Sequence, residues 1–201
     1  MVRKKIFVVL GADMAGKTTL INKSLRAVKD YGIKVSTKYT HFSAPPPGSN
    51  PVDMYIDALD EFREDPAEYW YLDRAWPESK FYEMHRRQRD IPFEDMMRVE
   101  QEFVKFADDN NYDISINLMW KPWDFVEQFH VHELENNKEF VAHSALANNE
   151  STDLLDRKVE HATYYKFMDS YFKQRGNEYA DLAKNFPFNM LFLTDLGFKL
   201  I

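Results

Sequence analysis

Residues 11–19, GADMAGKTT, combine the residue types that are needed to hold a chain of phosphate groups. They fit the pattern G-x-x-x-x-G-K-[ST] at every fixed position. Glycines let backbone N–H groups approach phosphate oxygens closely, the lysine carries charge to the outer phosphates, and the hydroxyl is placed to ligate magnesium. The residues predicted to bind the phosphates of ATP are Gly11, Ala15, Gly16, Lys17, Thr18 and Thr19.

A second candidate motif lies in residues 70–82, WYLDRAWPESKFY. Asp73 and Arg74 end an apolar run there, and the phosphate-binding stretch also follows an apolar run, residues 5–10. In a parallel sheet both motifs come to the carboxyl edge, where open α/β sheets bind their ligands. The planar guanidinium of an arginine grips phosphate oxygens in a bidentate manner. We therefore predict that Arg74 and Lys17 face one cleft; the alternative is a structural arginine paired with an acidic helix face.

These motifs need a scaffold of alternating strands and helices, and the hydrophobic pattern supplies one. The predicted strands are residues 5–10, 33–39, 69–72, 113–120 and 188–195. The predicted helices are residues 17–32, 52–65, 92–110, 122–137 and 153–176. Residues 44–51 are expected to form a proline-rich loop and residues 142–152 an irregular polar segment. We predict one α/β domain over residues 1–201, with the three-layer P-loop NTPase fold and a five-stranded parallel sheet covered by helices on both faces.

Composition limits the function classes. The chain has 201 residues, 44% of them hydrophobic, with a formal net charge of -7 and no cysteine. The absence of cysteine excludes disulfides and thiolate chemistry. An acidic balance argues against nucleic acid as an obligate partner. No segment has the apolar length needed to span a bilayer, so we expect no membrane partner and a cytoplasmic protein.

The stretches GADMAGKTT and LDRAWPESKFY together resemble the thymidylate kinase family. The loop of that family reads G-x-D-x-x-G-K-T-T, and its third strand ends in D-R with a serine and an aromatic residue following. Residues 155–172 resemble the end of its lid and the long helix after it, which places a short lid around residues 136–157. Only the first two stretches match strongly, so the chain is a divergent relative, as a virus-encoded version would be.

The resemblance implies a role for several residues of this chain. Asp13 would accept a hydrogen bond from the sugar 3'-hydroxyl of a monophosphate substrate. Arg74 would hold the phosphate of that substrate, and Arg157 would be the lid arginine that closes on the phosphates. Asp73 would anchor Mg²⁺ together with Thr18. The catalytic set is therefore Lys17, Asp73, Arg74 and Arg157.

The substrate base is the least defined part of this prediction. Tyr82 and Ser79 would lie near the base, and Phe62 and Arg63 could supply a stacking ring and a phosphate-binding cation. Glu83 stands where the family has an uncharged polar residue, which would favour guanine, or else it pairs with Arg86 or Arg87. The basic run at residues 85–89, HRRQR, could reach phosphates or form a solvated helix face.

The predicted function is transfer of the γ-phosphate of ATP to a deoxynucleoside monophosphate with Mg²⁺, with dGMP as one acceptor and a homodimer left open. The first alternative is a deoxynucleoside kinase, which needs a carboxylate base near the sugar. The segment KYTHFSAPP, residues 38–46, offers no carboxylate at the end of the second strand. The second alternative is a P-loop module that binds nucleotide and phosphorylates nothing; such a module does not need Arg74.

Overall fold

The computed structural model describes residues 4–43, 45, 49–178, 188–194 and 197–200. The strands are β1 (Lys4–Gly11), β2 (Thr37–His41), β3 (Tyr69–Asp73), β4 (Tyr112–Met119), β5 (Phe188–Thr194) and β6 (Gly197–Leu200). The helices are α1 (Lys17–Asp30), α2 (Pro51–Glu64), α3 (Trp76–Arg87), α4 (Phe93–Asn110), α5 (Trp123–Asn136), α6 (Lys138–Asn148) and α7 (Leu154–Glu178). None of these helices is both long and apolar enough to cross a membrane.

The strands form one sheet in the order β2-β3-β1-β4-β5-β6. Neighbours from β2 to β5 are parallel, and β6 pairs antiparallel with β5. In the residues that the structure describes, the sheet has six strands, and the predicted all-parallel sheet of five strands is corrected by the antiparallel edge strand β6. The central strand β1 lies between β3 and β4, with Val9 beside Asp73 and Gly11 beside Met119. This register brings the ends of β1 and β3 to one edge.

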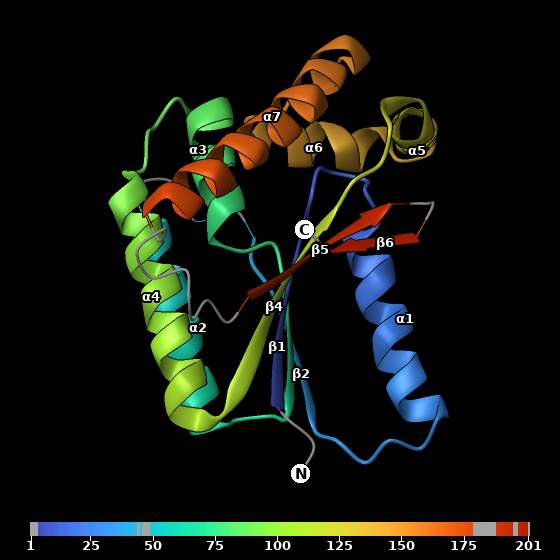
Figure 1. Cartoon of the computed structure of the whole chain (residues 1–201). Coiled ribbons are helices and arrows are strands. Elements are labelled where there is room, and N and C mark those ends of the chain that lie inside the picture. Colours follow the sequence, from blue (N-terminus) through green and yellow to red (C-terminus); the bar gives the residue numbers. More distant parts are fainter. Residues whose placement is uncertain (1–3, 44, 46–48, 179–187, 195–196, 201) are drawn as a thin grey trace.

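Helices cover both faces of the sheet, as the apolar strands require. Figure 1 shows α1 on one face and α2 and α4 on the other. Along β1, Ile6, Val8 and Leu10 belong to the larger core cluster, which includes residues of α2 and α4. Val9 belongs to the smaller cluster, in which Ile21 of α1 packs. The alternation of side chains along the strand thus produces the three layers.

Four helices gather over the carboxyl edge of the sheet: α3, α5, α6 and α7 (Figure 1). The sequence prediction missed α3 as a separate element, and it placed irregular chain at residues 142–152. Most of that segment is α6, because Val141 and Ala145 bury one face at i, i+4 spacing. The helix ends at Asn149, which adopts a left-handed conformation with φ 53°. Its polar residues are therefore the exposed face and end of a helix.

Phe62 lies in the aromatic core between α2 and the sheet. Its ring is fully buried and stacks on Trp70 with centroids 3.9 Å apart. Phe106 and Tyr112 pack against its edge, at centroid distances of 5.7 and 5.8 Å. A ring enclosed in this way has no face left to stack on a substrate base, so we correct the predicted role of Phe62.

This placement predicts a large effect of Phe62→Ala on folding. Removing a buried phenylalanine side chain should lower the free energy of unfolding by about 3–5 kcal/mol, and Phe62→Leu should cost less. Urea denaturation followed by circular dichroism measures both. A cost below about 1 kcal/mol would contradict the core assignment, because surface positions show effects of that size.

Candidate active site

The phosphate-binding stretch connects β1 to α1 at the carboxyl edge of the sheet. Gly16 caps α1 with φ 90°, a left-handed conformation that favours glycine. At Gly11 a side chain would meet the chain itself, since a Cβ would lie 3.0 Å from the carbonyl oxygen of Met119. Both glycines are thus required by backbone geometry, and the loop leads directly into a helix N-terminus, which favours anions.

Lys17, the first residue of α1, is 94% buried, and its ammonium turns back onto the loop. It donates to the carbonyl oxygens of Gly11 and Ala12, the second at 3.2 Å, and lies 4.0 Å from Oε1 of Glu78. Burial lowers the pKa of Lys17, against the opposing effect of Glu78. In this state the ammonium of Lys17 interacts with loop carbonyls and with the Glu78 carboxylate, where phosphate oxygens would otherwise be its partners.

Glu78 is a buried carboxylate that sequence reasoning missed. It accepts a hydrogen bond of 2.6 Å from the backbone N–H of Gly11 and one from the hydroxyl of Tyr164 on α7. Burial raises the pKa of Glu78 even though Lys17 lowers it. Glu78 therefore joins the phosphate loop to α3 and α7. An acidic residue in the first turn of a helix, directly after the Asp73-Arg74 motif, could have indicated Glu78, but α3 itself was not predicted.

Asp73 and Thr18 lie together, as predicted for a metal site. The hydroxyl of Thr18 donates to Oδ2 of Asp73 at 2.9 Å, and the hydroxyl of Tyr39 donates to the same oxygen at 3.0 Å. Burial alone would raise the pKa of Asp73, but His41, Lys17 and Thr18 together keep it below its usual value. The other oxygen, Oδ1, is buried with no hydrogen-bond partner in the described structure.

These two residues fit a hard divalent cation, because a hydroxyl and a buried carboxylate oxygen are ligands that Mg²⁺ accepts. The described residues contain no group of three or more His, Cys, Asp or Glu side chains that could hold a metal. A cation at Thr18 and Asp73 would thus take its other ligands from phosphate oxygens or water, as is usual for Mg²⁺.

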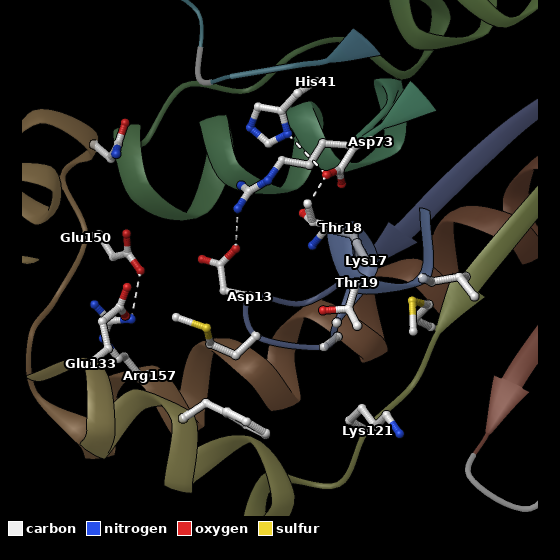
Figure 2. A pocket seen from close by; sticks show the side chains of 18 of the residues that line it. Asp13, Lys17, Thr18, Thr19, His41, Asp73, Lys121, Glu133, Glu150 and Arg157 are labelled. Atoms are coloured by element: carbon white, nitrogen blue, oxygen red, sulfur yellow. Dashed lines mark hydrogen bonds and ion pairs between the residues drawn. The ribbon is translucent and has the colours of Figure 1, made fainter. Parts of the chain in front are cut away.

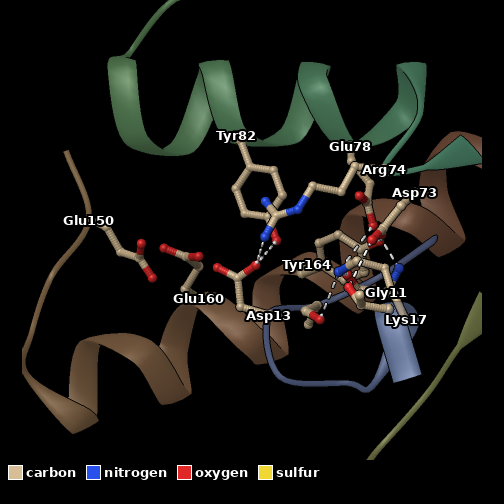
Figure 3. A network of polar contacts seen from close by, with 12 residues as sticks. Gly11, Asp13, Lys17, Asp73, Arg74, Glu78, Tyr82, Glu150, Glu160 and Tyr164 are labelled. Carbon is tan, nitrogen blue, oxygen red and sulfur yellow. Dashed lines mark hydrogen bonds and ion pairs between the residues drawn. The ribbon is translucent and has the colours of Figure 1, made fainter. Parts of the chain in front are cut away.

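Asp13 lies at the centre of a charged network (Figure 3). Its carboxylate pairs with Arg74 at 2.7 Å and with Arg86 at 2.6 Å, and the hydroxyl of Tyr82 donates to it at 3.3 Å. Burial alone would raise the pKa of Asp13, but the guanidinium groups outweigh it and hold the pKa well below its usual range. Asp13 is therefore a firmly ionised and weakly basic carboxylate.

The two arginines reach Asp13 from different elements. Arg74 directly follows β3 and adopts φ 64°, a left-handed conformation that is strained for arginine. The N–H of Arg74 donates to the carbonyl of Val9 at 3.2 Å, which fixes this turn. Arg86 comes from α3 and lies over the ring of Tyr82, 4.3 Å from its centroid. The sequence analysis gave Arg86 two possible roles, as part of a basic run that reaches phosphates or solvent and as a partner of Glu83, and its pairing with Asp13 was not predicted.

Arg157 comes from the beginning of α7 and is 93% buried. It lies 3.1 Å from Oε1 of Glu150, donates to the carbonyl of Ser151 at 2.9 Å, and contacts Nδ1 of His130 at 2.8 Å. The contact requires a neutral His130, whose ring nitrogen then accepts the hydrogen bond. The predicted lid arginine is thus held by Glu150 and Ser151, within residues 136–157, and by His130 of α5.

These elements enclose a cavity of about 860 Å³ (Figure 2). It reaches from the phosphate loop and Lys23 on α1 to Phe125 and Phe129 on α5 and to the loop after α6. Nine of the predicted site residues line it: Asp13, Ala15, Gly16, Lys17, Thr18, Thr19, Asp73, Arg74 and Arg157. Lys121, Glu133 and Glu150 line it as well and were not predicted, and so does Arg86, which belongs to the basic run that could reach phosphates.

The residues predicted to lie near the base surround a smaller adjoining cavity of about 40 Å³, with Arg74 and Arg86 in its wall. Ser79 and Tyr82 line it, and the hydroxyl of Ser79 is hydrogen-bonded to Tyr55 at 2.5 Å. Glu83 also lines it, but its carboxylate pairs with Arg87 at 2.6 Å and Arg89 at 3.1 Å. Glu83 is therefore engaged by arginines of its own segment, and the argument for guanine loses its basis.

Arg63 does not join either cavity. It pairs with Asp60 on its own helix and lies 3.8 Å from Glu102 of α4. Together with the burial of Phe62, this corrects the expectation that the end of α2 supplies substrate contacts. The residue types alone could not show whether the ring packs in the core or the cation pairs on the helix surface, because both depend on tertiary contacts.

Comparisons with known proteins identify the fold. No protein-family model and no curated protein matches the chain. Among solved structures, polyphosphate kinase 2 from Arthrobacter aurescens TC1 superposes with a TM-score of 0.57 at 15% identity, over 86% of this chain and 57% of that one. The chain thus spans little more than half of that protein, and the likeness is one of fold.

Deoxyadenosine kinase from M. mycoides with bound dATP superposes over 92% of this chain and 89% of that one, at 14% identity and a TM-score of 0.43. That superposition is too loose to carry an argument. Neither structure is described as a thymidylate kinase, so the resemblance to that family stays a prediction.

The contact between Arg157 and His130 predicts a pH dependence. Burial, assisted by Arg157, lowers the pKa of His130 to about 4, whereas an unfolded histidine has a pKa of about 6.5. The unfolded chain therefore binds a proton that the folded protein refuses, and stability is lost as pH falls from about 6.5 toward about 4. His130→Gln should remove this part of the loss.

Urea denaturation at pH 7 and pH 4.5 measures the effect on the wild type and on His130→Gln. His143→Gln is the matched control, because His143 is an exposed histidine on α6. We expect the wild type and the control to lose more stability on acidification than His130→Gln does. Equal losses in all three proteins would contradict a neutral, buried His130.

Proposed function

We propose that the chain is a P-loop phosphotransferase that moves the γ-phosphate of ATP to a nucleoside monophosphate. The observation that supports this most is the position of Arg74 and Arg86 at Asp13, in the wall of the cavity that contains the phosphate loop. The loop, Lys17 and a cation suffice for the donor phosphates. Two further arginines in the same cavity suit a second phosphorylated substrate.

The donor side follows from the loop. On binding ATP, the ammonium of Lys17 would exchange the carbonyls of Gly11 and Ala12 for phosphate oxygens. Thr18 and Asp73 would hold Mg²⁺, which neutralises charge on the transferring phosphate when it is bound. Because the loop backbone and the helix N-terminus are already in place, only side chains such as Lys17 would change partners, and preorganised charge is the main source of catalysis in such reactions.

The acceptor side follows from the arginines. The fork of Arg74 would hold the acceptor phosphate opposite Lys17, and Asp13 would orient the arginines and the sugar hydroxyl. Residues 136–157, with α6 and Arg157, would act as the lid of a single kinase domain. This arrangement supports a thymidylate-type kinase for deoxynucleoside monophosphates, with the base unassigned.

The alternative acceptor is a nucleoside, whose hydroxyl would need a proton acceptor. Asp13, a carboxylate of the loop itself, is a poor base because two arginines hold its pKa well below its usual range. At the end of β2 lies His41, whose Nδ1 is 3.3 Å from Asp73. A phosphate acceptor is already anionic and needs cations rather than a base, so this site favours a monophosphate.

A coupled assay of ADP formation with a panel of deoxynucleosides and their monophosphates tests the proposal. We expect turnover with at least one monophosphate and none with nucleosides. Lys17→Ala should reduce that turnover by about 100-fold or more, since it removes one preorganised charge. Turnover only with nucleosides would establish the alternative, and ATP binding without any turnover would indicate a binding module.

The role of Arg74 gives a sharper test. Arg74→Lys keeps the charge but loses the fork, so turnover with a monophosphate should fall by at least about tenfold, equivalent to about 1.4 kcal/mol. The affinity for ATP, measured by calorimetry, should change little. Arg98→Lys, at an exposed position on α4, is the control. Weaker ATP binding without a selective loss of turnover would place Arg74 on the donor side.

A further inference from the structure

Arg86 and Arg157 converge on a single oxygen of the protein's own Glu150. Oε1 of Glu150 lies 3.4 Å from Nη2 of Arg86 and 3.1 Å from Nη1 of Arg157. All three side chains are largely buried, with exposed fractions of 9% for Arg86, 7% for Arg157 and 14% for Glu150. Two guanidinium groups around one anionic oxygen is the arrangement that proteins use to bind a phosphoryl group.

Glu150 is the least firmly held carboxylate in this cluster. Arg86 already has closer partners, Asp13 at 2.6 Å and Glu160 at 2.5 Å. Burial, and then the charge of Asp13, raise the pKa of Glu150 even though both arginines lower it. The site is thus electrostatically unfavourable for this carboxylate, although its partners suit an anion.

Glu150 also lies where substrates would arrive. It lines the large cavity together with Asp13, Lys17 and both arginines. It belongs to the loop between α6 and α7. The residue before it, Asn149, donates a hydrogen bond from its side chain to the backbone carbonyl of Arg86. Figure 2 shows Glu150 and Arg157 joined on the side of the cavity away from Lys121. The carboxylate therefore comes from the lid and points into the reaction space.

We propose that Arg86 and Arg157 form an anion subsite for a substrate phosphoryl group, and that Glu150 occupies this subsite in the ligand-free protein. The proposal rests on the proposed function for the identity of the substrate. Around Arg86, three guanidinium groups (Arg74, Arg86 and Arg157) face three carboxylates (Asp13, Glu150 and Glu160). An arriving phosphate would add negative charge to this balanced, buried set, and the departure of Glu150 would restore the balance.

The consequence is a gain of binding when Glu150 loses its charge. If Glu150 only braced the lid, Glu150→Gln would loosen the arginines and weaken phosphate binding. If it competes with phosphate, the same change should strengthen phosphate binding. Inorganic pyrophosphate is the probe, because its binding needs neither a known acceptor nor turnover. Calorimetry on the full chain should give at least about threefold tighter binding for Glu150→Gln than for the wild type.

Two further variants locate the effect. Glu133→Gln removes the same charge from the wall of the same cavity, and no ion pair of Glu133 with Arg86 or Arg157 is present in the described structure, so it should give a smaller gain. In an Arg157→Gln background, Glu150→Gln should give no gain. Thermal unfolding verifies that each variant is folded. Glu150→Asp, with a carboxylate too short to reach both arginines, repeats the test if Glu150→Gln does not fold, and tighter binding is again expected.

Equal or weaker pyrophosphate binding by Glu150→Gln or Glu150→Asp, or a gain no larger than that of Glu133→Gln, would overturn the proposal. Repeating the titration with ATP and with the monophosphate that turns over assigns the subsite to the donor or the acceptor. The outcome is independent of the activity panel. Suppose that no monophosphate is turned over but Glu150→Gln binds pyrophosphate more tightly than the wild type. The proposed anion subsite would then stand, and the proposed kinase function would be wrong.

Discussion

The carboxylate of Asp13 connects the phosphate loop to the two arginines of the candidate site. Burying an ionised carboxylate is costly unless cations compensate it. Arg74 and Arg86 provide the compensation at 2.7 and 2.6 Å. Because Arg74 ends β3 in a strained turn and Arg86 comes from α3, the ion pairs set the position of the loop relative to both elements. The strain at Arg74 is tolerated because Asp13 and the backbone of Val9 fix that turn.

The loop has a second anchor in Glu78, whose Oε1 lies 4.0 Å from Nζ of Lys17. Glu78 accepts from the N–H of Gly11 and from Tyr164, so the loop is tied to α7 as well as to α3. The buried N–H of Gly11 is thus satisfied by a carboxylate, and the ammonium of Lys17 is satisfied by loop carbonyls. The ligand-free loop therefore makes internal substitutes for ligand contacts, which keeps its buried polar groups paired.

The parts of the site that local sequence determines were predictable. The loop from Gly11 to Thr19 has fixed spacing, and Asp73-Arg74 ends an apolar strand, so both fall at the same sheet edge. Contacts that depend on packing between distant segments were not predictable. Arg86 meets Asp13 across 73 residues of sequence and Glu160 across 74. Phe62 was misassigned for a related reason: only tertiary packing on Trp70 distinguishes a core ring from a stacking ring.

The same carboxylates explain how an acidic protein, with a net charge of -7, can carry a phosphate site. The three arginines of the site, Arg74, Arg86 and Arg157, are already paired with carboxylates, so their charge is compensated without a ligand. Under the proposed function, a substrate must replace one of these internal partners. A phosphate can do so, because it supplies oxygens of equal or greater charge to the same guanidinium groups. An uncharged nucleoside that displaced one of these carboxylates would leave an arginine unpaired, and that penalty gives the site a physical basis for selecting phosphorylated acceptors.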